Sequence, residues 1–142
     1  ISASSKLAAN YKYRRKGQLI FGKQNLFNGA VGIVPEEFDG FLSSTDIPTL
    51  DINRNFILPD FLDLYFGREN FYKSLEKYAV GSGSKRIHQK TILNIEINLP
   101  SKDEQRVIAK MTNALDLNSN IHQRKINEAQ NLKQGLLQQM FV

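Results

Sequence analysis

Amide and basic side chains gather in two short segments that contain glycine. The first, residues 22–29, holds a lysine, a glutamine and two asparagines between two glycines, and the second, residues 81–86, sets two serines before a Lys-Arg pair. Glutamine and asparagine can hydrogen-bond both polar atoms of an adenine edge, lysine and arginine can do so with guanine, and small residues let backbone amides approach a phosphate. The same compositions also occur at hairpin tips and in flexible connectors. The candidate side chains are Lys23, Gln24, Asn25, Asn28, Ser82, Ser84, Lys85 and Arg86.

Charge is distributed unevenly along the chain, whose net charge is +5. Residues 1–35 contain six Lys or Arg and no acidic residue, whereas residues 36–63 contain seven acidic residues and one Arg. A basic stretch of this kind favours a polyanionic partner, with nucleic acid the foremost candidate, although charge runs also occur on solvated surfaces. Tyrosine and basic residues alternate over residues 11–15. We expect Tyr11 and Tyr13 to be strand residues with one face buried rather than platforms for base stacking.

Few residues are arranged as catalytic or metal-binding groups. The chain has no cysteine, and its two histidines, His88 and His122, are far apart with no third ligand at a suitable spacing. Residues 81–86 do not form a phosphate-binding P-loop, because that motif needs four residues between its first glycine and a Gly-Lys pair followed by Ser or Thr. We therefore expect no metal site and no catalytic residue.

Apolar runs and turn residues predict a mixed-sheet domain of the α/β (α+β) class. The first two strands form a hairpin around the first amide-rich segment. Pro59 opens an amphipathic helix that we expect to end near Gly67, and a second helix follows. Strands are predicted at residues 18–21, 30–34, 38–45 and 48–52, the second helix at 69–78, and a half-buried strand with alternating apolar residues at 92–99.

The C-terminal segment, residues 101–142, predicts one long helix. Pro100 cannot continue a preceding hydrogen-bonded element, Ser101 is a good N-cap, and the side chain of Glu104 can bond back to the cap. A continuous helix of about 40 residues would be roughly 60 Å long, too long for a domain of about 100 residues with a radius of gyration of about 13 Å to bury. The alternative is two shorter helices, broken near residues 116–120 and folded back on the domain.

An apolar seam with alternating spacings of three and four residues runs along this helix and is typical of a coiled coil. Its centre carries Asn118, His122 and Lys125, and a polar centre weakens pairing but helps to fix the register. Since the domain cannot bury the whole seam, we expect a partner to pair with it. The expected pairing residues are Ile108, Met111, Leu115, Ala129, Leu132 and Leu136.

Length and composition limit the number of domains and the cellular location of the chain. With 142 residues, 41% of them hydrophobic, the chain is long enough for one domain, residues 1–100, plus the helical appendage of residues 101–142. No apolar run is long enough to span a membrane, and the first residues lack the order of a signal peptide. We therefore expect a cytoplasmic protein with no membrane partner.

Four features follow one another in a fixed order. They are the Gly-Ser-x-Ser-Lys-Arg loop of residues 81–86, the segment 93–100 that ends in Leu-Pro, the pair Glu104-Gln105 with Ile108 after it, and the ending Leu-Leu-x-x-Met-Phe of residues 136–141. Together they resemble the specificity subunit of Type I restriction-modification enzymes. Residues 13–34 and 40–44 are similar to the later part of that family's target recognition domain, so the resemblance covers nearly the whole chain.

The resemblance implies a non-catalytic subunit that recognises DNA. In this family each target recognition domain reads one half of a split DNA sequence, and helical conserved regions pair as an antiparallel coiled coil that sets the spacing and docks methyltransferase subunits. The implied partners are double-stranded DNA and the methyltransferase and restriction subunits. The chain would need no cofactor itself, because S-adenosylmethionine, ATP and Mg would belong to the partner subunits.

This resemblance assigns roles to the candidate residues. We expect phosphate contacts from Lys12, Arg14, Arg15 and Arg86, and base-edge contacts from Lys23, Gln24, Asn25 and Asn28. A full specificity subunit has two recognition domains and two conserved helices, whereas this chain has one of each and no Trp. We therefore expect a half-subunit or fragment that lacks the front part of the recognition domain and that could dimerise through its free helix.

Two other functions stay open at this point. A protein–protein scaffold would use the helix for dimerisation and leave the basic residues solvated, without affinity for DNA. A DNA-modifying enzyme in its own right would need catalytic groups that no motif in the sequence marks.

Overall fold

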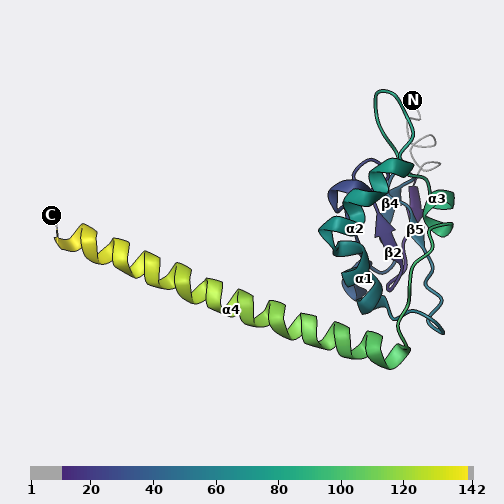
Figure 1. The fold of residues 1–142 in the computed structure, drawn as a ribbon. Helices are drawn as coiled ribbons and strands as arrows, with labels where there is room; N and C mark the ends of the chain where they lie inside the picture. Colours follow the sequence, from purple (N-terminus) through teal and green to yellow (C-terminus); the bar gives the residue numbers. More distant parts are fainter. Residues whose placement is uncertain (1–10, 141–142) are drawn as a thin grey trace. The chain divides into compact units, whose positions relative to one another are not determined.

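The computed structural model describes residues 11–140 (Figure 1). The first ten residues and Phe141-Val142, which the predicted domain and helix include, lie outside this range. Two compact units are present, one that extends to Arg106 and one that begins at Val107. Within the described range no helix is both long and apolar enough to cross a membrane.

A three-stranded antiparallel sheet lies at the centre of the first unit. Strand β2 (Leu19–Phe21) pairs with β3 (Val31–Ile33) on one side and with β5 (Thr49–Leu50) on the other. Leu19 and Phe21 are buried and Ile20 points to the opposite face, as the two-residue period of a strand requires. The predicted hairpin and the predicted fourth strand are confirmed.

A separate antiparallel pair joins β1 (Tyr11–Tyr13) to β4 (Leu42–Ser44). The predicted third strand is shorter than expected, because the 3₁₀ turn η3 (Glu36–Phe38) and Gly40, with φ of 77°, precede β4. A positive φ takes the chain out of extended geometry and suits glycine.

The prediction of a buried face on β1 is wrong. Tyr11 is 45% exposed and Tyr13 is 75% exposed. Leu42, which lies opposite Tyr13 in the register, is also exposed, so this two-stranded pair has no cover over that face among the described residues.

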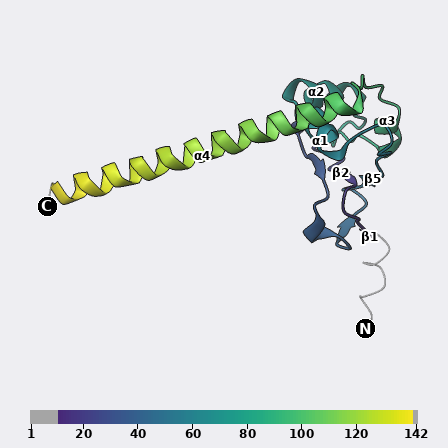
Figure 2. The same cartoon turned by 90° about the horizontal axis from the view of Figure 1, so that it is seen from below.

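Two helices cover one face of the three-stranded sheet (Figures 1 and 2). Helix α1 (Pro59–Gly67) has the predicted bounds, with Pro59 in the first turn, where a missing N–H leaves no hydrogen bond unmade. Helix α2 (Glu69–Ser74) and the 3₁₀ turn η4 (Leu75–Tyr78) together match the second predicted helix. Leu62 and Phe66, one turn apart on α1, face the core, and Phe66 meets Phe71 of α2 edge to face.

The hydrophobic core joins the sheet, the helices and two later segments. Full burial of such a side chain stabilises the fold by about 1.5–3 kcal/mol. Because Leu26 lies within the first amide-rich segment and Ile87 follows the second, the core anchors both segments. Its buried members are Leu19, Phe21, Leu26, Leu62, Phe66, Leu75, Ile87 and Ile92.

The predicted strand at residues 92–99 is wrong. Ile92 and Leu93 end a short helix, α3 (Gln89–Leu93), and the chain then runs to Pro100 without strand pairing. Ile95 and Ile97 still pack against the core while Glu96 is exposed. The alternation therefore indicated the burial of Ile95 and Ile97 correctly, but Leu93 and Leu99 on the same predicted side are 67% and 37% exposed. Alternation also carries no information on whether a neighbouring strand is present.

Helix α4 (Lys102–Met140) is one continuous helix of 39 residues. The predicted capping box is present: the carboxylate of Glu104 accepts from the backbone N–H of Ser101 at 2.8 Å, and the N–H of Glu104 donates to Ser101 Oγ at 3.3 Å. The alternative of a break near residues 116–120 is excluded, since the helix runs through this segment.

Candidate nucleic-acid interface

The first amide-rich segment is a tightly turned loop between β2 and β3. It contains the 3₁₀ turn η2 (Leu26–Asn28), and the buried side chain of Leu26 anchors it to the core. The backbone of Asn25 accepts from Ala30 at 3.0 Å, and Asn28 Nδ2 donates to Asn25 Oδ1 at 3.3 Å. Gly29 has φ of 87°, and a Cβ there would lie 3.3 Å from the ring of Tyr72, so any other residue would be strained.

Backbone hydrogen bonds tie this loop to two segments that are distant in sequence. The N–H of Lys23 donates to the carbonyl of Asp46 at 2.9 Å, and the N–H of Ile87 donates to the carbonyl of Lys23 at 2.8 Å. Ile87 is completely buried. These bonds therefore hold three segments side by side: the loop of residues 22–29, which we call the Lys23 loop, the turn after β4, and the end of the residue 81–86 loop.

Arg86 links the same three segments through its side chain. Its Nη1 lies 3.0 Å from Asp46 Oδ1, and the two side chains are 39% and 49% exposed. When the amide of Gln24 is oriented with its oxygen toward the guanidinium, that oxygen accepts from Nη2 at 2.7 Å and from Nε at 3.3 Å. We call these three residues the Gln24–Arg86–Asp46 cluster.

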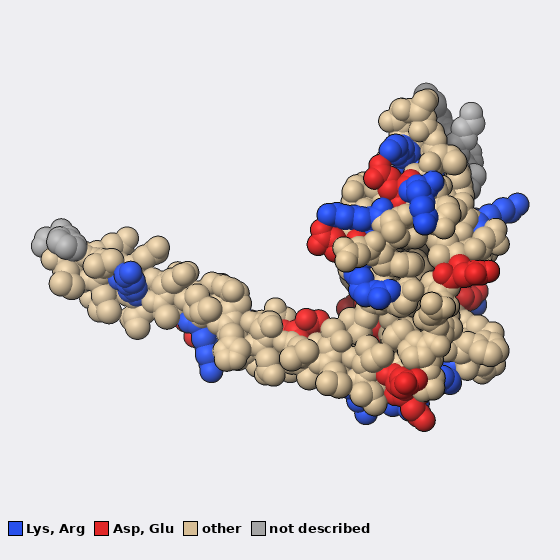
Figure 3. Space-filling model, viewed as in Figure 1, with Lys and Arg blue, Asp and Glu red and all other residues tan. Residues whose placement is uncertain are grey.

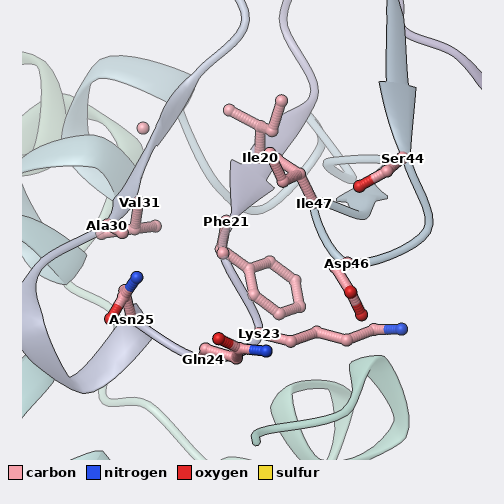
Figure 4. Close-up of a pocket in the computed structure, with 12 residues that line it drawn as sticks. Ile20, Phe21, Lys23, Gln24, Asn25, Ala30, Val31, Ser44, Asp46 and Ile47 are labelled. Atoms are coloured by element: carbon pink, nitrogen blue, oxygen red, sulfur yellow. The ribbon is translucent and has the colours of Figure 1, made fainter.

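An open pocket of about 550 Å³ lies beside this cluster. Figure 4 shows Asn25 next to Ala30 and Val31 on one side of the pocket, Lys23 and Asp46 on the other, and the ring of Phe21 between them. The apolar floor and the polar rim give one surface with donors and acceptors near each other. Such a surface suits the edge of a base, which also combines donors, acceptors and apolar parts.

The second glycine-containing segment is a closed loop. Val80 and Arg86 form an antiparallel bridge with two backbone hydrogen bonds of 2.9 Å each. Ser82 and Ser84 are exposed on the loop, and Lys85 forms an exposed ion pair with Glu76 at 2.7 Å. Arg86 thus belongs to the cluster, whereas Lys85 and the serines project at the surface beyond it.

The structure corrects the prediction that Arg14 contacts a phosphate, because its guanidinium is buried and donates hydrogen bonds within the protein. Arg14 is 6% exposed, and its Nη2 donates to the carbonyls of Ser44 at 3.0 Å and Ile47 at 2.7 Å. Its Nε donates to Ser43 Oγ. Burial lowers the pKa of Arg14, but an arginine remains protonated at neutral pH. Arg14 therefore holds the β4–β5 turn, which carries Asp46.

The other predicted phosphate contacts lie on separate elements. Lys12 is exposed in β1, and Arg15 follows that strand, where it pairs with Asp51 at 3.2 Å. Lys16 pairs in the same way with Glu36. The basic and acidic stretches of the sequence thus meet in space, and Figure 3 shows basic side chains (blue) next to acidic ones (red) over the first unit.

The predicted pairing residues of α4 all lie on the exposed surface of the helix. The five larger ones, Ile108, Met111, Leu115, Leu132 and Leu136, are between 42% and 66% exposed, and Ala129 is exposed too. Leu117 and Ile121, which were not among the predicted pairing residues, are 62% and 40% exposed and widen the apolar stripe near its polar centre. Ile121 follows Val107 and Ala114 at a spacing of seven, a signal that could have identified it.

Two further residues, Asp46 and Gln105, have roles that the sequence did not assign to them. Asp46 is an acidic residue, whereas the candidate DNA contacts in the sequence were basic, amide and hydroxyl side chains. Gln105 is 1% exposed: its Oε1 accepts from the N–H of Leu58 at 2.9 Å, and its Nε2 donates to the carbonyls of Phe56 at 2.9 Å and Pro100 at 3.0 Å. Glu104 therefore caps α4, and Gln105 bonds, within the first unit, to the loop before α1 and to Pro100.

Comparison with known proteins gives consistent matches. Residues 4–131 match the family described as Type I restriction modification DNA specificity domain. The chain is 23% identical over 135 residues to the specificity subunit of the Type I restriction enzyme HindI from Haemophilus influenzae, which covers 90% of this chain and 28% of that protein. The solved structure of the HsdS subunit from Thermoanaerobacter tengcongensis matches with a TM-score of 0.71 and 27% identity, over 84% of this chain and 31% of that chain.

The chain thus spans less than a third of the length of these two relatives. The family match covers most of the chain, including the Lys23 loop, the Gln24–Arg86–Asp46 cluster and most of α4. Fold, residue pattern and family match agree, and the chain belongs to the Type I restriction modification DNA specificity domain family.

Proposed function

We propose that this chain is the DNA-recognition module of a Type I restriction-modification system and reads one half of a split DNA site. The observation that carries the proposal is the family match together with the surface around Lys23, Asn25 and Arg86, where side chains suited to base edges lie on backbone segments that hydrogen bonds hold together. The Haemophilus influenzae relative is named as the specificity subunit of a Type I restriction enzyme.

Helix α4 gives the proposal its second part. Its exposed apolar stripe is suited to pair with another helix, either that of a second copy or one from a methyltransferase subunit. Paired helices would set the distance between two DNA half-sites, since helix length fixes the spacing.

Partners and location follow from this role. The chain has no catalytic part in the proposed function and needs no cofactor. S-adenosylmethionine, ATP and Mg would act in the methyltransferase and restriction subunits that it directs to DNA. Because the proposed target is cellular DNA, we expect the protein to act in the cytoplasm.

Selection from a library of random duplexes tests the proposal. The full chain is incubated with the library at about 100 mM salt, and the bound duplexes are recovered, amplified and sequenced over several rounds. We expect a short motif of fixed sequence to be enriched. Recovery of duplexes without any enriched motif would contradict sequence recognition.

One alternative function has an observation in its favour. Several cations of the first unit are paired with acids, which reduces attraction to DNA, while α4 exposes a long apolar stripe. A scaffold that only dimerises would be consistent with both facts. It predicts self-association with no recovery of duplex DNA in the same selection.

A further inference from the structure

Arg86 has two acceptors at once, Asp46 and, in the amide orientation described above, the oxygen of Gln24. Asp46 takes one N–H of Nη1, and the oxygen of Gln24 takes Nε–H and one N–H of Nη2. An arginine has five N–H donors. One N–H on each of Nη1 and Nη2 is therefore left, on a side chain that is 39% exposed.

We propose that the Gln24–Arg86–Asp46 cluster determines specificity for one G·C base pair, with Arg86 contacting guanine and with Gln24 and Asp46 as its positioning residues. This inference rests on the proposed function and deepens it. It changes the role expected for two residues: Arg86 reads a base edge rather than a phosphate, and Gln24 positions Arg86 rather than reading adenine.

The electrostatics of the cluster favour a base over a phosphate. A carboxylate beside the guanidinium cancels most of its net charge and repels a phosphate that approaches it. The edge of a base is neutral, so the same carboxylate brings no such repulsion. The chemistry also fits one base pair, since guanine offers two acceptors, O6 and N7, to an arginine fork, and the N4–H of cytosine can donate to the carboxylate of Asp46.

The rigidity of the cluster fits base recognition as well. Discrimination between bases requires donors held in a fixed direction, whereas attraction to phosphate does not. Backbone hydrogen bonds of Lys23, which precedes Gln24 in the chain, hold the three segments of the cluster together. The N–H of Lys23 donates to the carbonyl of Asp46 at 2.9 Å, and its carbonyl accepts from the N–H of Ile87, which follows Arg86, at 2.8 Å. These bonds do not involve the three side chains, so substitutions in the cluster should leave the fold intact.

The test is the duplex selection repeated with full-chain variants whose fold is verified by thermal unfolding. We expect the wild-type motif to contain a G·C pair that Arg86→Met relaxes at that position alone, with its discrimination falling from about 5- to 160-fold to nearly none. Asp46→Ala and Gln24→Leu should relax the same position. Gln24→Glu, which keeps an acceptor oxygen, should retain the preference.

Lys85→Met is the matched control, because Lys85 is the neighbouring exposed cation and lies outside the cluster. It should weaken binding to all sequences, reduce the slope of log K against log salt by at most about one unit, and leave the motif unchanged.

A phosphate role for Arg86 predicts the opposite pattern, which would overturn the inference. Arg86→Met would then lower the salt slope without altering the motif, and Asp46→Ala would strengthen binding to every duplex because a repelling charge is removed. A motif that keeps the same preference in all cluster variants would also overturn it. If the wild-type chain enriches no motif, the proposed function itself fails, and this inference fails with it.

Discussion

At the scale of single residues, Arg14 and Arg15 show how position decides what a cation does. They are neighbours in a basic run, yet Arg14 is buried against the carbonyls of the β4–β5 turn while Arg15 is exposed beside Asp51. The guanidinium of Arg14 reaches Ser43, Ser44 and Ile47 because its donors are spread over a planar fork. A lysine ammonium in its place could not reach all three.

We therefore expect Arg14→Lys to lower the free energy of unfolding by about 1.5–3 kcal/mol, the range for hydrogen bonds to charged groups. Urea unfolding followed by circular dichroism measures the change. The matched control is Arg15→Lys, which should change stability by less than about 0.5 kcal/mol. Equal effects of the two substitutions would show that Arg14 is not the structural residue we describe.

Gln105 is the second buried polar residue with a structural role. Its removal in Gln105→Ala would leave the N–H of Leu58 and the carbonyls of Phe56 and Pro100 without their partner. We expect a loss of about 1–3 kcal/mol in unfolding free energy, also measured in urea. Gln134→Ala, at an exposed position of α4, should change it by less than about 0.5 kcal/mol, and a small effect at Gln105 would contradict its role.

At the scale of elements, the cap at the start of α4 contributes to stability in a way that depends on pH, and the sign of that dependence follows from the pKa of Glu104. Hydrogen bonds from the hydroxyl and backbone N–H of Ser101 lower the pKa of Glu104 below its ordinary value of 4.5. A lowered folded-state pKa stabilises the folded protein above the unfolded-state value, and that contribution is lost as the pH falls through the folded-state pKa.

The variant Glu104→Gln isolates this effect, because glutamine keeps the shape and can still accept a hydrogen bond. We expect wild type to be more stable than the variant at pH 7 and the difference to shrink as the pH falls below about 4.5. Thermal unfolding at a series of pH values gives the difference. A difference that stays constant between about pH 7 and pH 3 would rule out a contribution from the charged carboxylate.

The elements also show which features a sequence pattern can predict. The bounds of α1, the β2–β3 hairpin and the cap of α4 follow from proline, alternation and capping residues, all of which act locally. Residues 92–99 alternate as a strand does, yet strand pairing depends on a distant neighbour that alternation does not specify. The short third strand has the same kind of cause, since the turn at Gly40 takes up part of the predicted run.

The candidate site was predictable only in part for a similar reason. Residue type pointed to Lys23, Gln24, Asn25 and Arg86, and the structure does bring these segments together. Asp46 joins them only through tertiary contacts, 40 residues away in sequence from Arg86. The burial of Arg14 is likewise a property of the β4–β5 turn and not of the basic run that contains it.

At the scale of the whole molecule, the exposed stripe of α4 predicts association. We expect the full chain to form dimers that Leu115→Lys weakens at least about tenfold, because a charge would be placed in the apolar seam. Gln134→Lys puts the same charge on the polar face of the helix and should have little effect. Sedimentation equilibrium compares the three proteins, and a wild-type monomer at all concentrations would contradict pairing with a second copy.

A chain that ends at Arg106 complements this comparison. It retains Gln105 and the capping box of α4 and removes the second unit. We expect it to be monomeric, since the pairing residues lie beyond it.

The central claim is that this chain recognises a DNA sequence, and a competition experiment tests it most directly. A labelled duplex that carries the selected motif is bound to the full chain, and unlabelled duplexes with the motif or with its bases scrambled are added in increasing amounts. Since each mismatched pair costs about 1–3 kcal/mol, the motif should compete at least about 100-fold better than the scrambled duplex. Equal competition by both would show that the chain binds DNA without recognising its sequence.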